Sequence, residues 1–334
     1  MYLLSFGTGI AQRVVQIMVR RKKEMQWAET CLARLESTAG TVLPEDARKK
    51  VLTAYSIYLP MVIDAFATLR GRPTSQGERT RMLQYFICST TFDNFTDDEE
   101  LTVAELNDIA FASESFMART PQERLFLQSH MALRDFVKDQ QHYGEVTRSL
   151  FQAQVNSVRQ TDPGLTNEEL YGITVGKGAF AVLLCNFYMD DMEISHNWQQ
   201  CWFLLGGIIQ LTNDLFDTFK DLQEGIQTLP TRMKDANQLY QTFKKMVDEL
   251  EEEIAALPVP ETRRRKFRLN MMAICSFGDM ALRQFRTIQQ QQNVMPDLHT
   301  LPRKALIIDM EKPGNIWHCM RFTYGRCRQA DRMC

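Results

Sequence analysis

Three oxygen-bearing side chains, those of Asn213, Asp217 and Asp221, follow one another at intervals of four residues in a stretch that begins apolar and ends acidic. Residues four apart lie on one face of an α-helix, so their oxygens would form a row along it. Carboxylate and amide oxygens are ligands that Mg²⁺ prefers. The spacing predicts a metal-binding strip, and a charged helix end facing solvent is the alternative interpretation.

A second strip in the stretch 82–100 has the same layout, with apolar or small residues first and acids last. Asp93 and Asp97 are four residues apart, and Phe86 and Thr90 fall on the same helical face. We expect the apolar halves of both stretches to line one cavity, with the acids facing each other across its mouth. Facing acids repel one another unless cations lie between them, which again implies divalent metal.

A metal site at the mouth of an apolar cavity suits a ligand with an anionic head and a hydrocarbon tail. An isoprenoid diphosphate has that chemistry, and metal ions would neutralise the diphosphate and help it to leave. The predicted cavity residues are Phe86, Thr90, Gly178, Gly206, Ile209 and Gln210.

Two sequence motifs carry a resemblance to a known family. Asp93-Asn-Phe-Thr-Asp97-Asp98 resembles the DxxxDD motif of squalene and phytoene synthases. The stretch 210–230 is similar to their second aspartate-rich motif with its following loop, and also to the NSE triad of class I terpene synthases. The chain therefore resembles the class I isoprenoid synthase superfamily on its squalene/phytoene synthase side, which some bacterial terpene cyclases (class IB type) share.

The resemblance implies an all-α helical bundle around a central apolar cavity. It implies a Mg²⁺ cluster, which Mn²⁺ could replace, held by Asp93, Asp97, Asn213, Asp217 and Asp221 as catalytic metal ligands. It further implies that a linear polyprenyl diphosphate is ionised to an allylic carbocation and then cyclised. The residues expected to bind the diphosphate are Lys177, Lys220 and Arg232.

Departures from the family pattern bear on the reaction type. Asn213 and Lys220 fit the terpene-synthase triad better than the purely acidic motif of the condensing enzymes. The stretch 171–178 also lacks the tyrosine- and cysteine-containing segment of head-to-head synthases. The preferred interpretation is a cyclase, a lyase acting on one diphosphate. A head-to-head prenyltransferase and a non-catalytic helical homologue are the alternatives.

The elements that would position these motifs are helices, because apolar residues recur at intervals of three and four along almost the whole chain. No biased linker or repeat divides the chain, so one all-α domain over residues 1–334 is expected. Capping signals predict helix starts at Thr102 and Pro121 and a helix end at Gly225. Breaks are predicted at 37–44, 71–77, 162–167, 225–231 and 258–260.

Two features near the motifs have more than one interpretation. Gly176 and Gly178, on either side of Lys177, would either break a helix and direct Lys177 inward or permit a tight helix crossing. Arg232 would either reach the diphosphate or lie on the surface.

The amino-acid composition indicates which partners and which cellular location to expect. Hydrophobic residues make up 44% of the chain, and 39 basic residues against 41 acidic ones give a net charge of −2, which argues against a nucleic-acid partner. Eight scattered cysteines suggest reduced thiols and a cytoplasmic location. No transmembrane segment is expected. The apolar stretch 1–17 with the basic residues 20–23 after it is expected to form a helix packed on the bundle, and a weak contact with a membrane surface is the alternative. A homodimer is left open.

Overall fold

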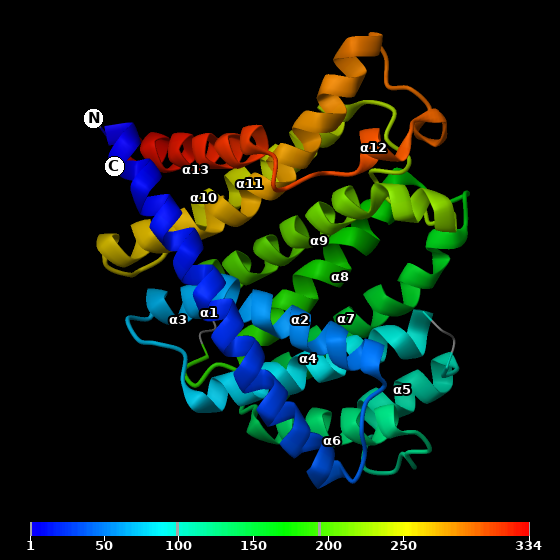
Figure 1. Cartoon of the computed structure of the whole chain (residues 1–334). Helices are drawn as coiled ribbons and strands as arrows, with labels where there is room; N and C mark the ends of the chain where they lie inside the picture. Colours follow the sequence, from blue (N-terminus) through cyan, green and yellow to red (C-terminus); the bar gives the residue numbers. More distant parts are fainter. Residues whose placement is uncertain (1, 98–99, 193–194, 334) are drawn as a thin grey trace. The chain divides into compact units, whose positions relative to one another are not determined.

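The computed structural model describes the backbone of residues 2–97, 100–192 and 195–333. Within these ranges it describes the side chains of residues 19–330, except that of residue 97. The described residues form helices, turns and loops and contain no strand, which confirms the predicted all-α fold (Figure 1). The chain divides into two compact units, residues 1–147 with 184–192 and residues 148–183 with 193–334. The single domain expected over 1–334 stays a prediction.

The first unit is built on four helices that pack on one another, namely α1, α2, α4 and α6. Its core contains the fully buried rings of Tyr55, Phe66 and Phe95. The elements are α1 (Tyr2–Ala39), α2 (Glu45–Tyr58), a π-helical turn (Leu59–Ile63), α3 (Asp64–Leu69), α4 (Gln76–Asp97), α5 (Val103–Phe111), α6 (Pro121–Phe136) and the first part of α7 (Gln140–Ser157).

The second unit is built around α9 (His196–Glu224), which contacts α10, α11 and α12. The fully buried Trp202 and Leu205 belong to an apolar face of α9 whose residues recur at intervals of three and four. The other elements are the rest of α7, α8 (Asn167–Phe187) as far as residue 183, α10 (Ala236–Ala256), α11 (Glu261–Gln292), α12 (Arg303–Leu306), α13 (Pro313–Met333) and short 3₁₀ turns at Val158–Thr161 and Leu298–Thr300.

The predicted helix ends are confirmed. Thr102 and Glu105 form the capping box that starts α5, and Pro121 stands in the first turn of α6. Gly225 ends α9 with a φ of 71°, and its N–H bonds to the carbonyl of Asp221. A left-handed residue is tolerated best when it is glycine, so this position fixes where the acidic end of α9 stops.

Two helical stretches are long and apolar enough to cross a membrane by length and composition alone. They are Glu45–Leu69 and Asn167–Phe187, and 56% and 61% of their apolar windows are buried inside the protein, as in core helices.

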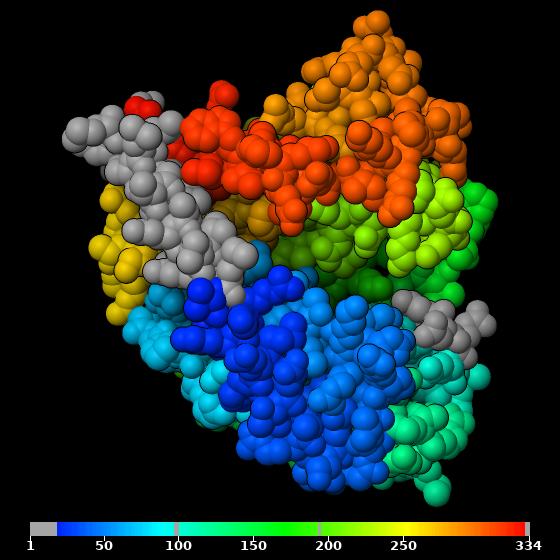
Figure 2. Space-filling view, viewed as in Figure 1, coloured from blue at the N-terminus to red at the C-terminus, as the bar shows by residue number. Residues whose placement is uncertain are grey.

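The segment from α12 into α13 forms part of the surface drawn in Figure 2, in orange to red. Helix α13 packs on α11, which buries Thr323 and Ala330 on its inner side and leaves Trp317 half exposed on its outer side.

Candidate metal-binding strip on helix α9

The polar face of α9 carries the predicted row of oxygen donors. Asn213 and Asp217 are exposed, whereas Asp221, at the end of the row, is only 8% exposed. The apolar face of the helix is buried in the second unit and fixes this orientation, since side chains at intervals of four project in one direction. The predicted strip therefore exists as a row of side chains, and its last member is a buried acid.

Asp214, a buried acid beside the strip, was not singled out from the sequence. The hydroxyl of Thr174 on α8 donates to its Oδ2 at 2.9 Å, and the side-chain amide of Gln210 donates to its Oδ1 at 2.9 Å. Gln210, predicted as a cavity residue, is therefore engaged with an acid. The available signal was spacing, because Asp214 follows Gln210 by one helical turn and precedes Asp221 by two.

The carboxylates of this face repel one another. Burial, followed by the neighbouring Asp214 and Asp217, raises the pKa of Asp221 to about 7. Burial also raises the pKa of Asp214 to about 6, although its two hydrogen bonds and the nearby Lys177 lower it. The pKa of Asp217 is raised as well, by partial desolvation of its carboxylate, although Lys220 lowers it. Bringing a cation to this face would relieve the repulsion and restore the charged form of Asp221.

The donor types on the strip fit a hard divalent cation. Two carboxylates and one amide offer only oxygen atoms, which suit Mg²⁺ better than the softer metals that select sulfur or imidazole. Among the residues that the structure describes, no group of three or more His, Cys, Asp or Glu side chains is placed to hold one metal ion. The strip would thus need ligands beyond its own acids, and Mg²⁺ commonly retains water and substrate oxygens in that role.

Replacing Thr174 by valine is expected to destabilise the protein by about 2 kcal/mol at pH 8, because the buried Asp214 carboxylate loses a donor. At pH 5, below the Asp214 pKa of about 6, the carboxyl is mostly protonated and the loss should be about half as large or less. Urea unfolding at both pH values measures the difference. The matched control is Thr91→Val, whose buried hydroxyl donates to the Ile87 carbonyl and should show a pH-independent effect. Equal losses for Thr174→Val at both pH values would contradict the assignment.

Two predicted diphosphate-binding lysines lie near the strip. Lys220 is 65% exposed and is 3.8 Å from the carboxylate of Glu224, an exposed pair that contributes little to stability and leaves the ammonium able to turn to another anion. Lys177, partly buried on α8, lies close enough to Asp214 to lower the pKa of that acid.

The two glycines predicted to line the cavity lie at the crossing of α8 and α9. A Cβ on Gly178 would lie 2.3 Å from the carbonyl oxygen of Gly206, and a Cβ on Gly206 would lie 2.3 Å from that of Gly178. Helix α8 runs without interruption from Asn167 to Phe187. The expectation of a broken helix at 176–178 is therefore wrong, and the tight crossing accounts for Gly178. Ile209, one turn after Gly206, is partly exposed.

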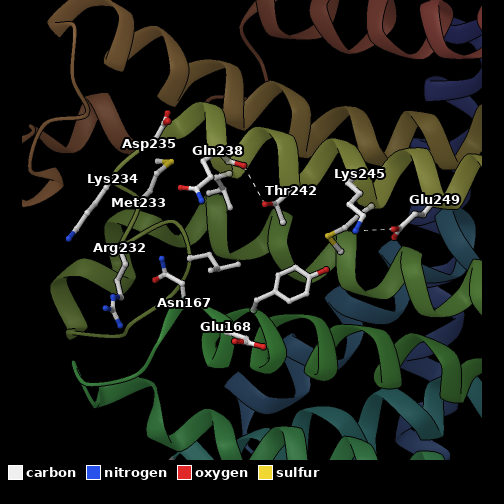
Figure 3. A pocket seen from close by; sticks show the side chains of 14 residues that line it. Asn167, Glu168, Arg232, Met233, Lys234, Asp235, Gln238, Thr242, Lys245 and Glu249 are labelled. Atoms are coloured by element: carbon white, nitrogen blue, oxygen red, sulfur yellow. Dashed lines mark hydrogen bonds and ion pairs between the residues drawn. The ribbon is translucent and has the colours of Figure 1, made fainter.

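Arg232 lies apart from the strip residues in the same unit. Its guanidinium donates to the carbonyl of Leu165 and lines a groove of about 610 Å³ between the start of α8, the loop after α9 and α10 (Figure 3). None of the predicted metal ligands lines this groove. Its lining holds cations and acids in equal number, Arg232, Lys234 and Lys245 against Glu168, Asp235 and Glu249.

The first unit holds the remaining predicted site residues on α4. Phe86 is 7% exposed and packs against the rings of Tyr58 and Tyr85, and Thr90 is buried. Asp93 is partly exposed. Asp97 ends the helix, but its side chain and all of Asp98 lie outside the described residues. Whether this strip faces the one on α9 concerns both units and stays a prediction.

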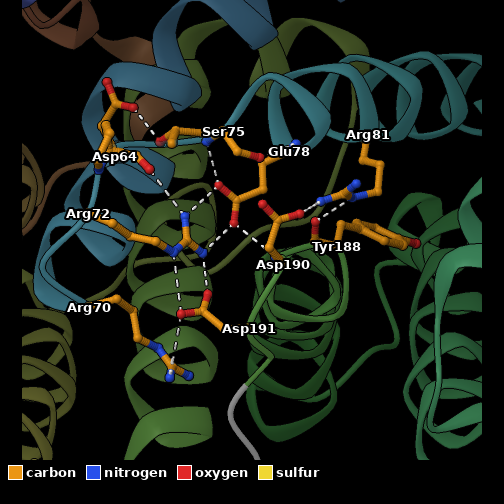
Figure 4. Close-up of polar contacts among 11 residues, drawn as sticks. Asp64, Arg70, Arg72, Ser75, Glu78, Arg81, Tyr188, Asp190 and Asp191 are labelled. Atoms are coloured by element: carbon orange, nitrogen blue, oxygen red, sulfur yellow. Dashed lines mark hydrogen bonds and ion pairs between the residues drawn. The ribbon is translucent and has the colours of Figure 1, made fainter.

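A second cluster of charges in the first unit has a structural explanation. The fully buried Glu78 accepts hydrogen bonds from Arg72 at 2.8 and 2.6 Å and from the backbone N–H of Asp190 at 2.9 Å. Asp191 pairs with the same arginine, and Arg81 pairs with Asp190 (Figure 4). These bonds tie the segment 188–191 to the start of α4.

In comparisons with known proteins, no protein-family model matches the chain, and no curated protein matches it.

Proposed function

We propose that this chain is a Mg²⁺-dependent class I terpene synthase that ionises a linear polyprenyl diphosphate and cyclises the resulting carbocation. The observation that supports it best is the polar face of α9. There, oxygen donors recur at intervals of four and end on Asp221, a buried acid whose pKa of about 7 reflects burial and like-charged neighbours. An acid whose pKa is raised by burial and by specific charged neighbours is a candidate functional residue.

Each residue of this face would have a distinct role in the reaction. Asn213, Asp217 and Asp221 would hold Mg²⁺, which when bound neutralises the diphosphate as a leaving group. Lys220 would leave its exposed pair with Glu224 and bind a diphosphate oxygen. Thr174 and Gln210 would hold Asp214 in place beneath the strip. Asp93 and Asp97 of α4 are the further metal ligands that the sequence predicts.

Product analysis tests the proposal directly. The full-length protein is incubated with Mg²⁺ and, one at a time, with geranyl, farnesyl, geranylgeranyl and longer diphosphates, and both released diphosphate and hydrocarbons are measured. A cyclised product of unchanged carbon number, lost when EDTA is added, is the expected result. A product of doubled carbon number would assign the chain to the head-to-head prenyltransferases. If no substrate releases diphosphate with Mg²⁺ or Mn²⁺, both assignments fail and a non-catalytic role is the one left.

A further inference from the structure

Four exposed apolar side chains lie close together in sequence, two in the segment that joins α12 to α13 and two in the first turns of α13. The exposed fractions are 38% for Ile307, 36% for Met310, 49% for Ile316 and 54% for Trp317. The other tryptophan side chains of the second unit, Trp198 and Trp202, are buried. Scattered exposed apolar residues need no explanation, but a group of them that includes tryptophan indicates a binding surface.

This segment is held by the fold. The side-chain amide of Gln284 on α11 donates to the carbonyls of Ala305 and Ile307, at 2.7 and 3.2 Å. The amide of Asn315 donates to the carbonyl of Asp309 at 2.7 Å, which closes the turn before α13. The apolar side chains are therefore displayed by an ordered backbone, and little conformational entropy would be lost if they entered another phase.

Exposed cations lie on the same stretch of chain as the apolar side chains. Lys304, Lys312, Arg321 and Arg328 are exposed, and within the described part of the chain none of them pairs with an acid. Arg326, by contrast, faces inward and pairs with Asp248 and Glu251 of α10. The sequence of α13 contains a single acid, Asp331, which follows the last described side chain.

The segment between α12 and α13 contains two acids, Asp309 and Glu311. Asp309 is partly buried, and its side chain accepts a hydrogen bond from the backbone N–H of Glu311 at 3.0 Å. Glu311 is exposed. Among the described side chains of residues 303–330, five cations are exposed, these four and Arg303, against one exposed acid. A helix with a basic outer face and an apolar edge is typical of proteins that lie on a membrane surface.

We propose that the α12–α13 surface, defined by Ile307, Met310, Ile316, Trp317 and their four flanking cations, docks on a lipid bilayer that carries anionic headgroups. Ile316 and Trp317 would enter the interfacial region, where tryptophan is favoured, and the lysines and arginines would contact the headgroups. This location differs from the N-terminal stretch 1–23 for which the sequence suggested a weak membrane contact. The proposal does not depend on the proposed enzymatic function.

Vesicle co-sedimentation of the full-length protein tests the proposal. We expect binding to vesicles of phosphatidylcholine with phosphatidylserine, little binding to phosphatidylcholine alone, and weakening as salt is raised. Trp317→Ser should reduce the partition coefficient about tenfold, because the main apolar anchor is lost. Lys304→Gln with Lys312→Gln should reduce it about fivefold for each charge removed.

Matched control variants separate this surface from the protein surface in general. Val294→Ser removes a side chain of the same unit that is 62% exposed, and Lys245→Gln with Lys266→Gln removes two exposed cations elsewhere in that unit. All variants should melt at the wild-type temperature within a few degrees and the controls should bind as the wild type does.

Three results would overturn the proposal. One is Trp317→Ser binding vesicles like the wild type. Another is loss of binding only when Leu3 and Leu4 are replaced by serine, which would place the contact at the N-terminus. The third is that sedimentation velocity shows Trp317→Ser dissociating a dimer while the wild type ignores anionic vesicles, which would make the surface a contact between copies of the chain.

Discussion

Replacing Asp221 by asparagine is expected to lower diphosphate release by about a thousandfold while the protein remains folded. The substitution keeps the size and shape of the side chain but removes one of the charges that would hold Mg²⁺. Losing a charged metal ligand that acts on the leaving group costs several kcal/mol of transition-state stabilisation, and about 4 kcal/mol corresponds to a thousandfold in rate. Diphosphate release at saturating substrate and Mg²⁺ measures the effect.

The same substitution should stabilise the metal-free protein at high pH. The pKa of Asp221 is about 7 in the folded state and about 4 in an unfolded chain, so the folded state holds its proton more tightly. Stability attributable to this group therefore falls as pH rises from about 4 to about 7. The asparagine side chain cannot ionise, so Asp221→Asn should be more stable than the wild type at pH 8 by roughly 1–3 kcal/mol and nearly equal at pH 4.

A control variant and the addition of Mg²⁺ test whether these effects are specific to Asp221. Glu224→Gln removes an exposed carboxylate of the same helix and should change diphosphate release less than about threefold, since an exposed pair contributes little. Mg²⁺ should raise the melting temperature of the wild type and have a smaller effect on Asp221→Asn, because only the intact strip binds the ion. Wild-type activity in Asp221→Asn would remove Asp221 from the proposed site. Equal stability of the two proteins at pH 8 would show that its carboxylate is not buried against like charges.

The all-α fold class and the row of oxygen-bearing side chains on α9 could be predicted from the sequence. Periodicity predicts helices well when tertiary packing agrees with it. Helix α9 has an apolar side that the second unit buries and a polar side on which Asn213 and Asp217 are exposed. The start of α5 at Thr102 and the end of α9 at Gly225 were predicted for local reasons, capping and left-handed backbone, and these do not depend on distant residues.

The contacts of the side chains around the α9 strip could not be predicted from the sequence, because they depend on how the helices cross. Asp214 is adjacent to Asn213 in sequence, but Thr174, a donor to its carboxylate, comes from another helix. Arg232 is near Asp221 in sequence, yet its guanidinium turns to the carbonyl of Leu165. One of the two interpretations placed Lys177 beside a helix break, and it is instead found on a continuous helix near Asp214. Each case depends on the packing of α8 and the loop after α9, which sequence spacing does not specify.

That packing rests on the crossing of α8 and α9, and Gly178→Ala should destabilise the protein by more than about 4 kcal/mol. The new methyl group would lie 2.3 Å from the carbonyl oxygen of Gly206 and 2.5 Å from Cβ of Gln210, well inside contact distance. Since one of these neighbours is backbone, rotamer changes cannot relieve the clash and the helices must separate. Effects of that size arise when the protein cannot relax around an inserted group.

Other glycines of the same helices provide a graded series. Gly172 lies on α8, and a Cβ added there would have no atom within 4 Å, so Gly172→Ala should stabilise the protein by up to about 1 kcal/mol through helix propensity. Gly207→Ala would meet Cε of Met246 at 3.0 Å, the mobile end of a flexible side chain, and should cost about 1 kcal/mol. Urea unfolding of the three variants tests the order, and Gly207→Ala keeps the test valid if Gly178→Ala does not fold.

The series also tests whether the crossing positions the strip. Thr174 lies one turn before Gly178 on α8, so separating the helices at Gly178 would draw its hydroxyl away from Asp214. A folded Gly178→Ala protein should therefore lose most of the extra destabilisation that Thr174→Val causes in the wild type at pH 8, a coupling that a double-mutant cycle measures. Additive effects would show that the contact with Thr174 does not depend on the close approach of Gly178 and Gly206.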